Sequence, residues 1–292
     1  MTIRTVRWFM GLALLFAMAP AVAGAEAIRR QIESSMLVTG HVTIEPDGQA
    51  SHLEIDQSEK IPPFVRALME RARASWRFEP VLADGVASRV TSRMSVRVVA
   101  RKMESGDYQV MLRSAYFGAD AIDGRERIDT FGTATVRGRK LQPPSYPDTA
   151  IEMHAKGTVY LLVQVGPDGK PMDAIAEQTN LQVVGRSEGE MRFMRNLLAK
   201  AALASSRRWL FDVPTTGELA DDPYWLVRVP LVFIWVGDRQ PVYGEWEAYI
   251  PGPKQRAPWA EDDGRGDADA MLAGGIYPIG QGLRLLTPLQ PG

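Results

Sequence analysis

The chain has 292 residues, of which 45% are hydrophobic and 24% charged, and its formal net charge at pH 7 is -1. Sequence-independent nucleic-acid binding needs a concentrated basic face, so we expect no nucleic-acid partner. The chain contains no Cys, which excludes disulfides, thiolate zinc sites and a cysteine nucleophile.

Residues 1–25 have the layout of a secretory signal peptide. Arg4 and Arg7 precede an apolar run over residues 8–19, and small residues follow Pro20. An uncleaved inner-membrane anchor is the alternative, but a spanning helix needs ~20 apolar residues and Pro20 ends this run too early. We therefore expect a cleaved, periplasmic protein.

Residues 26–118 are expected to form a first small domain that begins with a hairpin. Two runs of alternating apolar and polar residues flank a Pro-Asp-Gly sequence, which favours a tight turn between antiparallel strands. The turn residues are Pro46, Asp47 and Gly48. A calcium-binding loop is excluded because neither Pro-Asp-Gly segment of the chain has the several oxygen ligands and closing Glu that it needs.

A helix, an aromatic pair and two strands follow in this first domain. Pro62 and Pro63 suit the first turn of a helix. Apolar residues then recur every four positions, which predicts a buried stripe of Phe64, Leu68, Ala72 and Trp76. Trp76 and Phe78 form the aromatic pair. The next strand alternates, with Val90, Met94, Val96 and Val98 on one face and Arg89, Arg93 and Arg97 on the other. A hairpin appends a further strand over residues 107–117.

Residues 119–140 are rich in Gly, Asp and Arg and are interpreted as a linker to a second domain, residues 141–237. Its first strand, residues 158–165, is followed by the turn residues Pro167, Asp168 and Gly169. Ser187 and Glu190 form a capping box before a helix. The expected buried stripe of that helix is Met191, Met194, Leu198 and Ala201. Trp209 and Phe211 then precede a last strand.

The same order of elements therefore occurs twice, which indicates a duplication. The predicted fold class is α+β: two tandem two-layer domains, each a three-stranded antiparallel sheet packed by one helix. Residues 238–292 are dense in Gly and Pro without a sustained period, and we expect this tail to be extended or disordered.

Several of these segments resemble the C-terminal domain of TonB-type energy transducers. Tyr146-Pro147 precede a short helix, Gly157 opens a strand before the second Pro-Asp-Gly turn, and the post-helix signature of the family matches residues 76–80, WRFEP. The resemblance implies a periplasmic protein-binding module that pairs with extended segments of outer-membrane receptors during energy-dependent, siderophore-type transport. If the N-terminal segment is not cleaved, the resemblance also implies an inner-membrane motor complex as a partner. A soluble periplasmic adaptor or scaffold without energy transduction is the alternative.

In that family the pairing strand is the last one, which the resemblance places at residues 224–236. The partner-binding residues it implies are Tyr224, Trp225, Leu226, Val227, Arg228, Val229, Phe233 and Trp235, together with Tyr146 and Pro147. Pro230 interrupts this strand and, lacking an N–H, is typical of a sheet edge. The alternative interpretation places Trp225, Phe233 and Trp235 in the core. The first domain is expected to bind more weakly or to act as a spacer.

Residues 185–189, GRSEG, fit the G-x-S-x-G pattern of a serine hydrolase. In that architecture the His follows the Ser, yet the chain's His residues, His41, His52 and His154, all precede it. Ser187 is therefore interpreted as a helix cap, with a hydrolase as the remote alternative. We expect no catalytic residue, cofactor or metal site. The acidic residues Asp262, Asp263, Asp267 and Asp269 are interpreted as a solvated loop.

Overall fold

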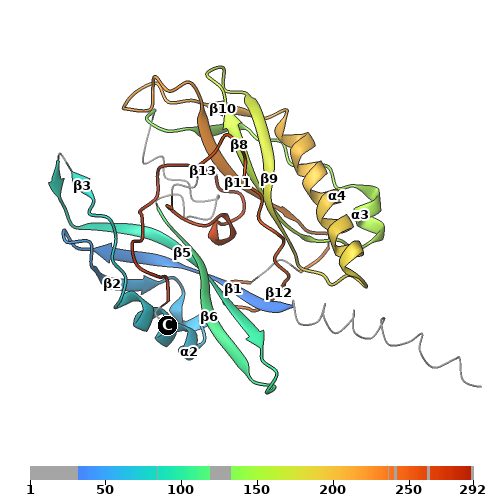
Figure 1. The fold of residues 1–292 in the computed structure, drawn as a ribbon, viewed down its shortest axis with the longest axis horizontal. Coiled ribbons are helices and arrows are strands. Elements are labelled where there is room, and N and C mark those ends of the chain that lie inside the picture. Colours follow the sequence, from blue (N-terminus) through green and yellow to red (C-terminus); the bar gives the residue numbers. More distant parts are fainter. Residues whose placement is uncertain are drawn as a thin grey trace, which may run out of the picture.

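The computed structural model describes residues 32–83, 85–118, 133–235, 237–239, 242–261 and 264–290. It is built mainly of antiparallel sheets with a few helices, which agrees with the α+β prediction (Figure 1). The expected signal peptide and most of the expected linker lie outside these ranges. Within them, no helix is long and apolar enough to cross a membrane.

The first unit combines one sheet with helix α2 (Pro63–Arg73). Its long strands are β1 (Glu33–Ile44), β2 (Ala50–Ile55), β5 (Val90–Lys102) and β6 (Tyr108–Phe117). They lie in the order β2-β1-β5-β6, all antiparallel. The short elements are η1 (Ser58–Lys60), β3 (Leu82–Ala83) and β4 (Val86–Ala87).

The second unit combines a sheet with helices α3 (Asp148–Glu152) and α4 (Glu188–Ser206). Its strands β8 (Gly157–Val165), β9 (Pro171–Leu181) and β11 (Trp225–Phe233) are antiparallel in the order β9-β8-β11. Two short strands, β7 (Arg137–Lys140) and β10 (Leu210–Asp212), pair beside it. β7 lies in the last part of the expected linker.

The two Pro-Asp-Gly turns have the same geometry. Asp47 and Asp168 each accept a hydrogen bond from the backbone N–H two residues later, at 2.9 and 3.0 Å. Gly48 and Gly169 have φ of 83° and 73°, a region that favours glycine. The turns therefore do in both units what the sequence predicts of them.

Each turn also contacts the aromatic pair that follows the helix of its unit. Phe78 N–H donates to Gly48 O, and Phe211 N–H donates to Gly169 O, both at 2.8 Å. A Cβ on Gly48 would lie 2.1 Å from the carbonyl oxygen of Phe78, and one on Gly169 would lie 2.3 Å from that of Phe211. Both glycines are thus required by the close approach of this backbone as well as by φ.

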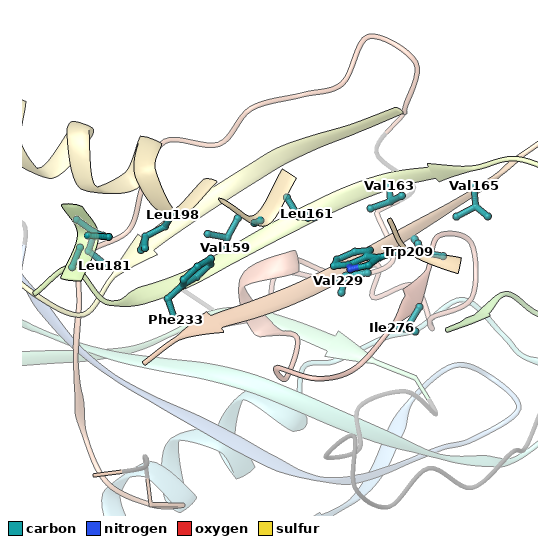
Figure 2. Close-up of a cluster of buried hydrophobic side chains, with 14 of the residues drawn as sticks. Val159, Leu161, Val163, Val165, Leu181, Leu198, Trp209, Val229, Phe233 and Ile276 are labelled. Atoms are coloured by element: carbon teal, nitrogen blue, oxygen red, sulfur yellow. The ribbon is translucent and has the colours of Figure 1, made fainter. Parts of the chain in front are cut away.

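The helices cover the outer faces of the two sheets. In the second unit Met191, Met194 and Leu198 are buried as expected, while Ala201 is partly buried and Ala202 is buried in its place. Leu198 lies against the odd-numbered residues of β8 (Figure 2). In the first unit the expected stripe is wrong by one position at its start. Phe64 is 54% exposed, and Val65 is buried in its place. The full buried stripe is Val65, Met69, Ala72 and Trp76.

The C-terminal segment, residues 242–261 and 264–290, lies in the tail that was expected to be extended or disordered. It is largely extended. Its middle part runs between the helix-free faces of the two sheets and contacts both, whereas its last residues pack against the core of the first unit beside α2 (Figure 1). Strand β12 (Glu247–Tyr249) joins β1 of the first sheet, and β13 (Tyr277–Pro278) joins β11 of the second. Between them lies the 3-10 helix η2 (Ala268–Ala270). The tail therefore belongs to both units.

Residues that precede the second unit complete its aromatic pair. Gly138 pairs with Phe211 in the ladder of β7 and β10. Four residues after Gly138, the carbonyl oxygen of Gln142 accepts a hydrogen bond from Trp209 Nε1 at 2.8 Å.

The last residues of the chain do the same for the first unit. Leu285 forms a bridge with Phe78, and Leu289, four residues later, accepts a hydrogen bond from Trp76 Nε1 at 2.8 Å. In the first unit, the C-terminal segment therefore makes the backbone pairing and the Trp hydrogen bond with the aromatic pair. In the second unit, residues 138–142 make the same two contacts.

Candidate protein-binding edge

Strand β11 has two unequal edges. One edge pairs with β8 along its whole length, from Trp225 opposite Val165 to Phe233 opposite Gly157. Within the described residues, the other edge pairs with the two-residue strand β13 and receives backbone hydrogen bonds from its neighbours Gly274 and Ile279. The strand implied by the resemblance is therefore the edge of the three-stranded sheet, and a short tail strand covers its middle.

The backbone groups on this outer edge belong to even-numbered residues. Ile279 N–H donates to Leu226 O at 2.8 Å, and Gly274 N–H approaches Pro230 O at 3.5 Å. In an antiparallel ladder, alternate residues direct their backbone groups to the same side. Pro230 therefore places its missing N–H on the outer edge, where no bond to β8 is lost.

The odd-numbered side chains of β11 lie in the core of the second unit. Trp225, Val227, Val229 and Phe233 are buried among the residues of Figure 2. Trp225 is anchored by a hydrogen bond from Nε1 to Leu219 O at 2.8 Å. This burial matches the core alternative for Trp225 and Phe233. Because their backbone groups face β8, a partner strand on the outer edge would pair with the even-numbered residues instead.

The even-numbered side chains face the first unit. Arg228 is buried and forms a bidentate ion pair with Glu177 of β9, with Nε–Oε2 at 2.9 Å and the second N–O distance at 3.1 Å. Leu226 is half-buried, and Val232, near the end of the strand beyond β13, is 40% exposed. The outer edge is therefore most open toward Val232.

An aromatic cluster lies where β11 ends. The ring of Tyr146 contacts Phe233 edge-on, with centroids 5.6 Å apart, and contacts Trp235 at 5.6 Å. Trp235 also lies 5.4 Å from His154. Burial raises the pKa of Tyr146 to about 12, so its hydroxyl stays protonated and donates to the carbonyl oxygen of Ala155. The structure thus brings together three of the expected site residues.

Two other expected partner-binding residues, Pro147 and Tyr224, take no part in the ring contacts of this aromatic cluster. Pro147 is half-buried and immediately precedes α3. Tyr224 is 37% exposed and immediately precedes β11.

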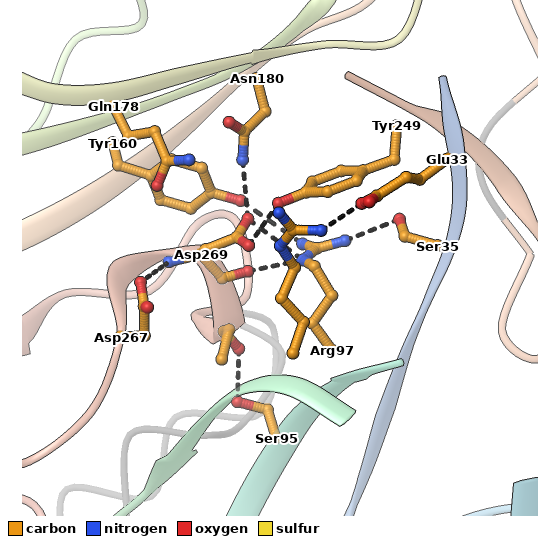
Figure 3. Close-up of polar contacts among 12 residues, drawn as sticks. Glu33, Ser35, Ser95, Arg97, Tyr160, Gln178, Asn180, Tyr249, Asp267 and Asp269 are labelled. Carbon is orange, nitrogen blue, oxygen red and sulfur yellow. Dashed lines mark hydrogen bonds and ion pairs between the residues drawn. The ribbon is translucent and has the colours of Figure 1, made fainter. Parts of the chain in front are cut away.

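A buried polar cluster between the sheets was missed by sequence reasoning (Figure 3). Asp269 of the tail forms an ion pair with Arg97 of β5, with Nε–Oδ1 at 3.2 Å. It also accepts hydrogen bonds from Asn180 of β9 at 2.7 Å and from the hydroxyl of Tyr249 at 2.5 Å. Asp269 therefore joins both sheets and does not lie in a solvated loop. The available signal was Arg97, a cation in an apolar strand that needs a buried partner.

A cleft of about 830 Å³ opens beside this cluster. Its arginines are engaged within the chain, since Arg93 pairs with Asp56 at 3.0 Å and Arg97 pairs with Asp269. Burial raises the pKa of Glu247, which accepts a hydrogen bond from Gln182 at 3.0 Å. The pair of Arg97 and Asp269 and the hydrogen bond of Gln182 to Glu247 connect the tail to the two sheets, whereas Arg93 and Asp56 both belong to the first unit.

Ser187 has the geometry of a helix cap. Its hydroxyl oxygen accepts a hydrogen bond from Glu190 N–H at 3.1 Å at the start of α4. Over the parts of the chain that the structure describes, no group of three or more His, Asp or Glu residues could hold a metal ion.

No family model, no curated protein and no solved structure matches this chain.

Proposed function

We propose that the protein is a periplasmic protein-binding module whose β11 edge pairs with an extended segment of an outer-membrane receptor, in the manner of TonB-like energy transducers. One observation supports this proposal most strongly. The outer edge of β11 accepts an extended segment in antiparallel register, with Arg228 opposite Tyr277 and a hydrogen bond from Ile279 N–H to Leu226 O. Strand addition of this kind gains affinity from backbone hydrogen bonds.

The rest of the edge supports the same use. Its core-facing side chains are fixed by burial, so an added strand meets a preformed surface. Val232 and the backbone beyond β13 offer room to lengthen the pairing.

A periplasmic adaptor or scaffold without energy transduction is the second candidate. The tail favours it, because β12, η2 and β13 together hold both sheets in one arrangement through the buried pair of Arg97 and Asp269. A transducer that pulls on its partner would have either to keep these contacts between the tail and the sheets under force or to break them.

The proposed function is tested by NMR titration of the full chain with peptides from the N-terminal segments of outer-membrane receptors. We expect saturable shifts at the amides of Leu226, Arg228 and Val232. Shifts restricted to the first unit, or none at millimolar peptide, would rule out receptor pairing at β11 and leave the scaffold. Fractionation should place the protein in the periplasm, and Met1 retained in an inner-membrane fraction would favour the anchored alternative.

A further inference from the structure

The segment 274–280 occupies the β11 edge as a ligand strand would. Tyr277 lies opposite Arg228, and Ile279 N–H bonds Leu226 O in the same register. The segment is part of the tail and is far in sequence from β11. Its pairing therefore involves the same backbone groups that a partner strand would use.

Two neighbouring side chains anchor this segment on opposite faces of the sheet. Ile276 is 2% exposed and enters the core of the second unit, where a Cβ on Gly138 would lie 2.4 Å from its Cδ1. Tyr277 is fully buried and packs edge-on against Tyr116 of the first unit, with centroids 5.0 Å apart. Its hydroxyl donates to Leu272 O at 3.0 Å.

Pro278 falls at a position that tolerates proline. It lies opposite Val227, an odd-numbered residue whose backbone groups face β8. An N–H at position 278 would therefore have no acceptor on β11, whereas the N–H of Ile279 has one.

We infer that residues 274–280 are an intramolecular competitor for the β11 edge. The partner then has the chemistry of that segment: an extended peptide with an aliphatic residue, an aromatic residue, and a third position that accepts Pro. This inference rests on the proposed function and names the partner class and its regulation. To displace this segment, a partner must gain at least as much free energy from apolar burial as the segment loses. A partner that lacks an aliphatic and an aromatic anchor gains too little.

The first test locks the segment in place. Val227→Cys with Pro278→Cys creates a pair at directly opposed, non-hydrogen-bonded positions, where Cα atoms lie at roughly 4.5 Å, within the range for a disulfide. The chain has no other Cys, so the redox state of this pair is the only variable. The probe is a fluorescent peptide of residues 272–282, LAGGIYPIGQG.

We expect the reduced variant to bind the peptide at least about tenfold more tightly than the oxidised variant. Val227→Cys alone is the control and should bind equally under both conditions. Ile276→Ser in the full chain removes one anchor without a disulfide, and should also raise affinity above that of the unsubstituted chain. Equal binding by oxidised and reduced protein, or no binding by the reduced form and by Ile276→Ser, overturns the inference.

Peptide variants test the register. Ile279→Pro in the peptide removes the N–H that bonds Leu226 O and should abolish binding, while Pro278→Ala should retain it. The reverse order would contradict the inferred pairing.

Receptor peptides separate this inference from the proposed function. If they fail while the 272–282 peptide binds the reduced form, the competitor stands and the receptor assignment falls. If receptor peptides bind oxidised and reduced protein equally, they bind elsewhere on the molecule and receptor pairing at β11 falls, while the 272–282 peptide still decides whether the competitor stands.

Discussion

The two units differ most at the position beside their last strand. In the first unit this position holds β6, a 10-residue strand joined to β5 by a hairpin. In the second unit the equivalent edge of β11 holds β13, a 2-residue strand from a distant part of the tail. β6 follows β5 through a short hairpin loop, so ordering that loop costs little entropy and the pairing extends along the strand. β13 is separated from β11 by a long loop, whose closure costs more entropy, and it pairs over only two residues. The outer edge of the last strand is thus paired over nine residues in the first unit, from Met94 to Lys102, and over two residues in the second unit.

The largest expected effect comes from deleting residues 283–292. The first unit would lose the acceptor of Trp76 Nε1 and three partly buried leucines, which are Leu283, Leu285 and Leu289. We expect a loss of about 3–5 kcal/mol in the free energy of unfolding of the first unit, measured by denaturant titration with hydrogen exchange. Leu286→Ala is the control; Leu286 is 57% exposed, so the change should stay within about 0.5 kcal/mol. A loss of stability confined to the second unit would contradict the equivalence of residues 285–289, which contact Trp76 and Phe78, with residues 138–142, which contact Trp209 and Phe211.

Asp269→Ala tests the junction between the units and should cost about 3–5 kcal/mol, because it leaves Arg97 buried without its carboxylate. Thermal unfolding measures the loss. Lys254→Ala, which breaks the more exposed pair with Asp267, should cost about 0–1 kcal/mol. Adding Arg97→Met to Asp269→Ala should restore part of the stability. Equal losses for the buried and exposed pairs would argue against Asp269 as the link.

Gly48→Ala and Gly169→Ala test the likeness of the two turns and should each cost roughly 2–4 kcal/mol, through positive φ and a clash with a backbone carbonyl. Gly106→Ala is matched in φ, at 93°, but its Cβ would meet nothing within 4 Å. It should cost only about 1–2 kcal/mol. Denaturant midpoints compare the three. A tolerated substitution at only one Pro-Asp-Gly turn would break the comparison.

The smallest effect concerns the helix starts. The N-cap of α4 is Ser187, while α2 begins at Pro63 without a side-chain cap. Ser187→Ala should lower the stability of the second unit by about 0.5–2 kcal/mol and leave the first unchanged. Labelling of Ser187 by a fluorophosphonate probe would instead favour the hydrolase.

Local features of the fold could be predicted from sequence because they depend on few neighbouring residues. The Pro-Asp-Gly turns, the cap at Ser187 and the core face of β8 are of this kind. The rotation of α2 was misjudged because Phe64 fits the same period as Trp76, although the buried stripe begins at Val65.

The tail could not be predicted because its structure comes from distant contacts. Its Gly- and Pro-rich sequence has no hydrophobic periodicity. Its contacts are with residues far away in sequence: Asp269 forms an ion pair with Arg97, and the carbonyl oxygen of Leu289 accepts a hydrogen bond from Trp76. Pro230 indicated that β11 lies at a sheet edge. The sequence did not indicate that β13 pairs with this edge, because a strand of two residues is too short to show an alternating pattern.

Hydrogen exchange of the full chain tests most directly whether the β11 edge is held reversibly. The backbone of β5 faces β6 at odd-numbered residues, because Arg93 O accepts a hydrogen bond from Gly118 N–H. Val99 lies opposite Met111 of β6, so its amide faces the outer neighbour of β5 as the amide of Arg228 faces β13. The account predicts that Arg228 exchanges at least about tenfold faster than Val99, because opening β13 does not require the second sheet to unfold. Equal protection of the two amides would show that the edge is closed as firmly as in the first unit, and would contradict the account.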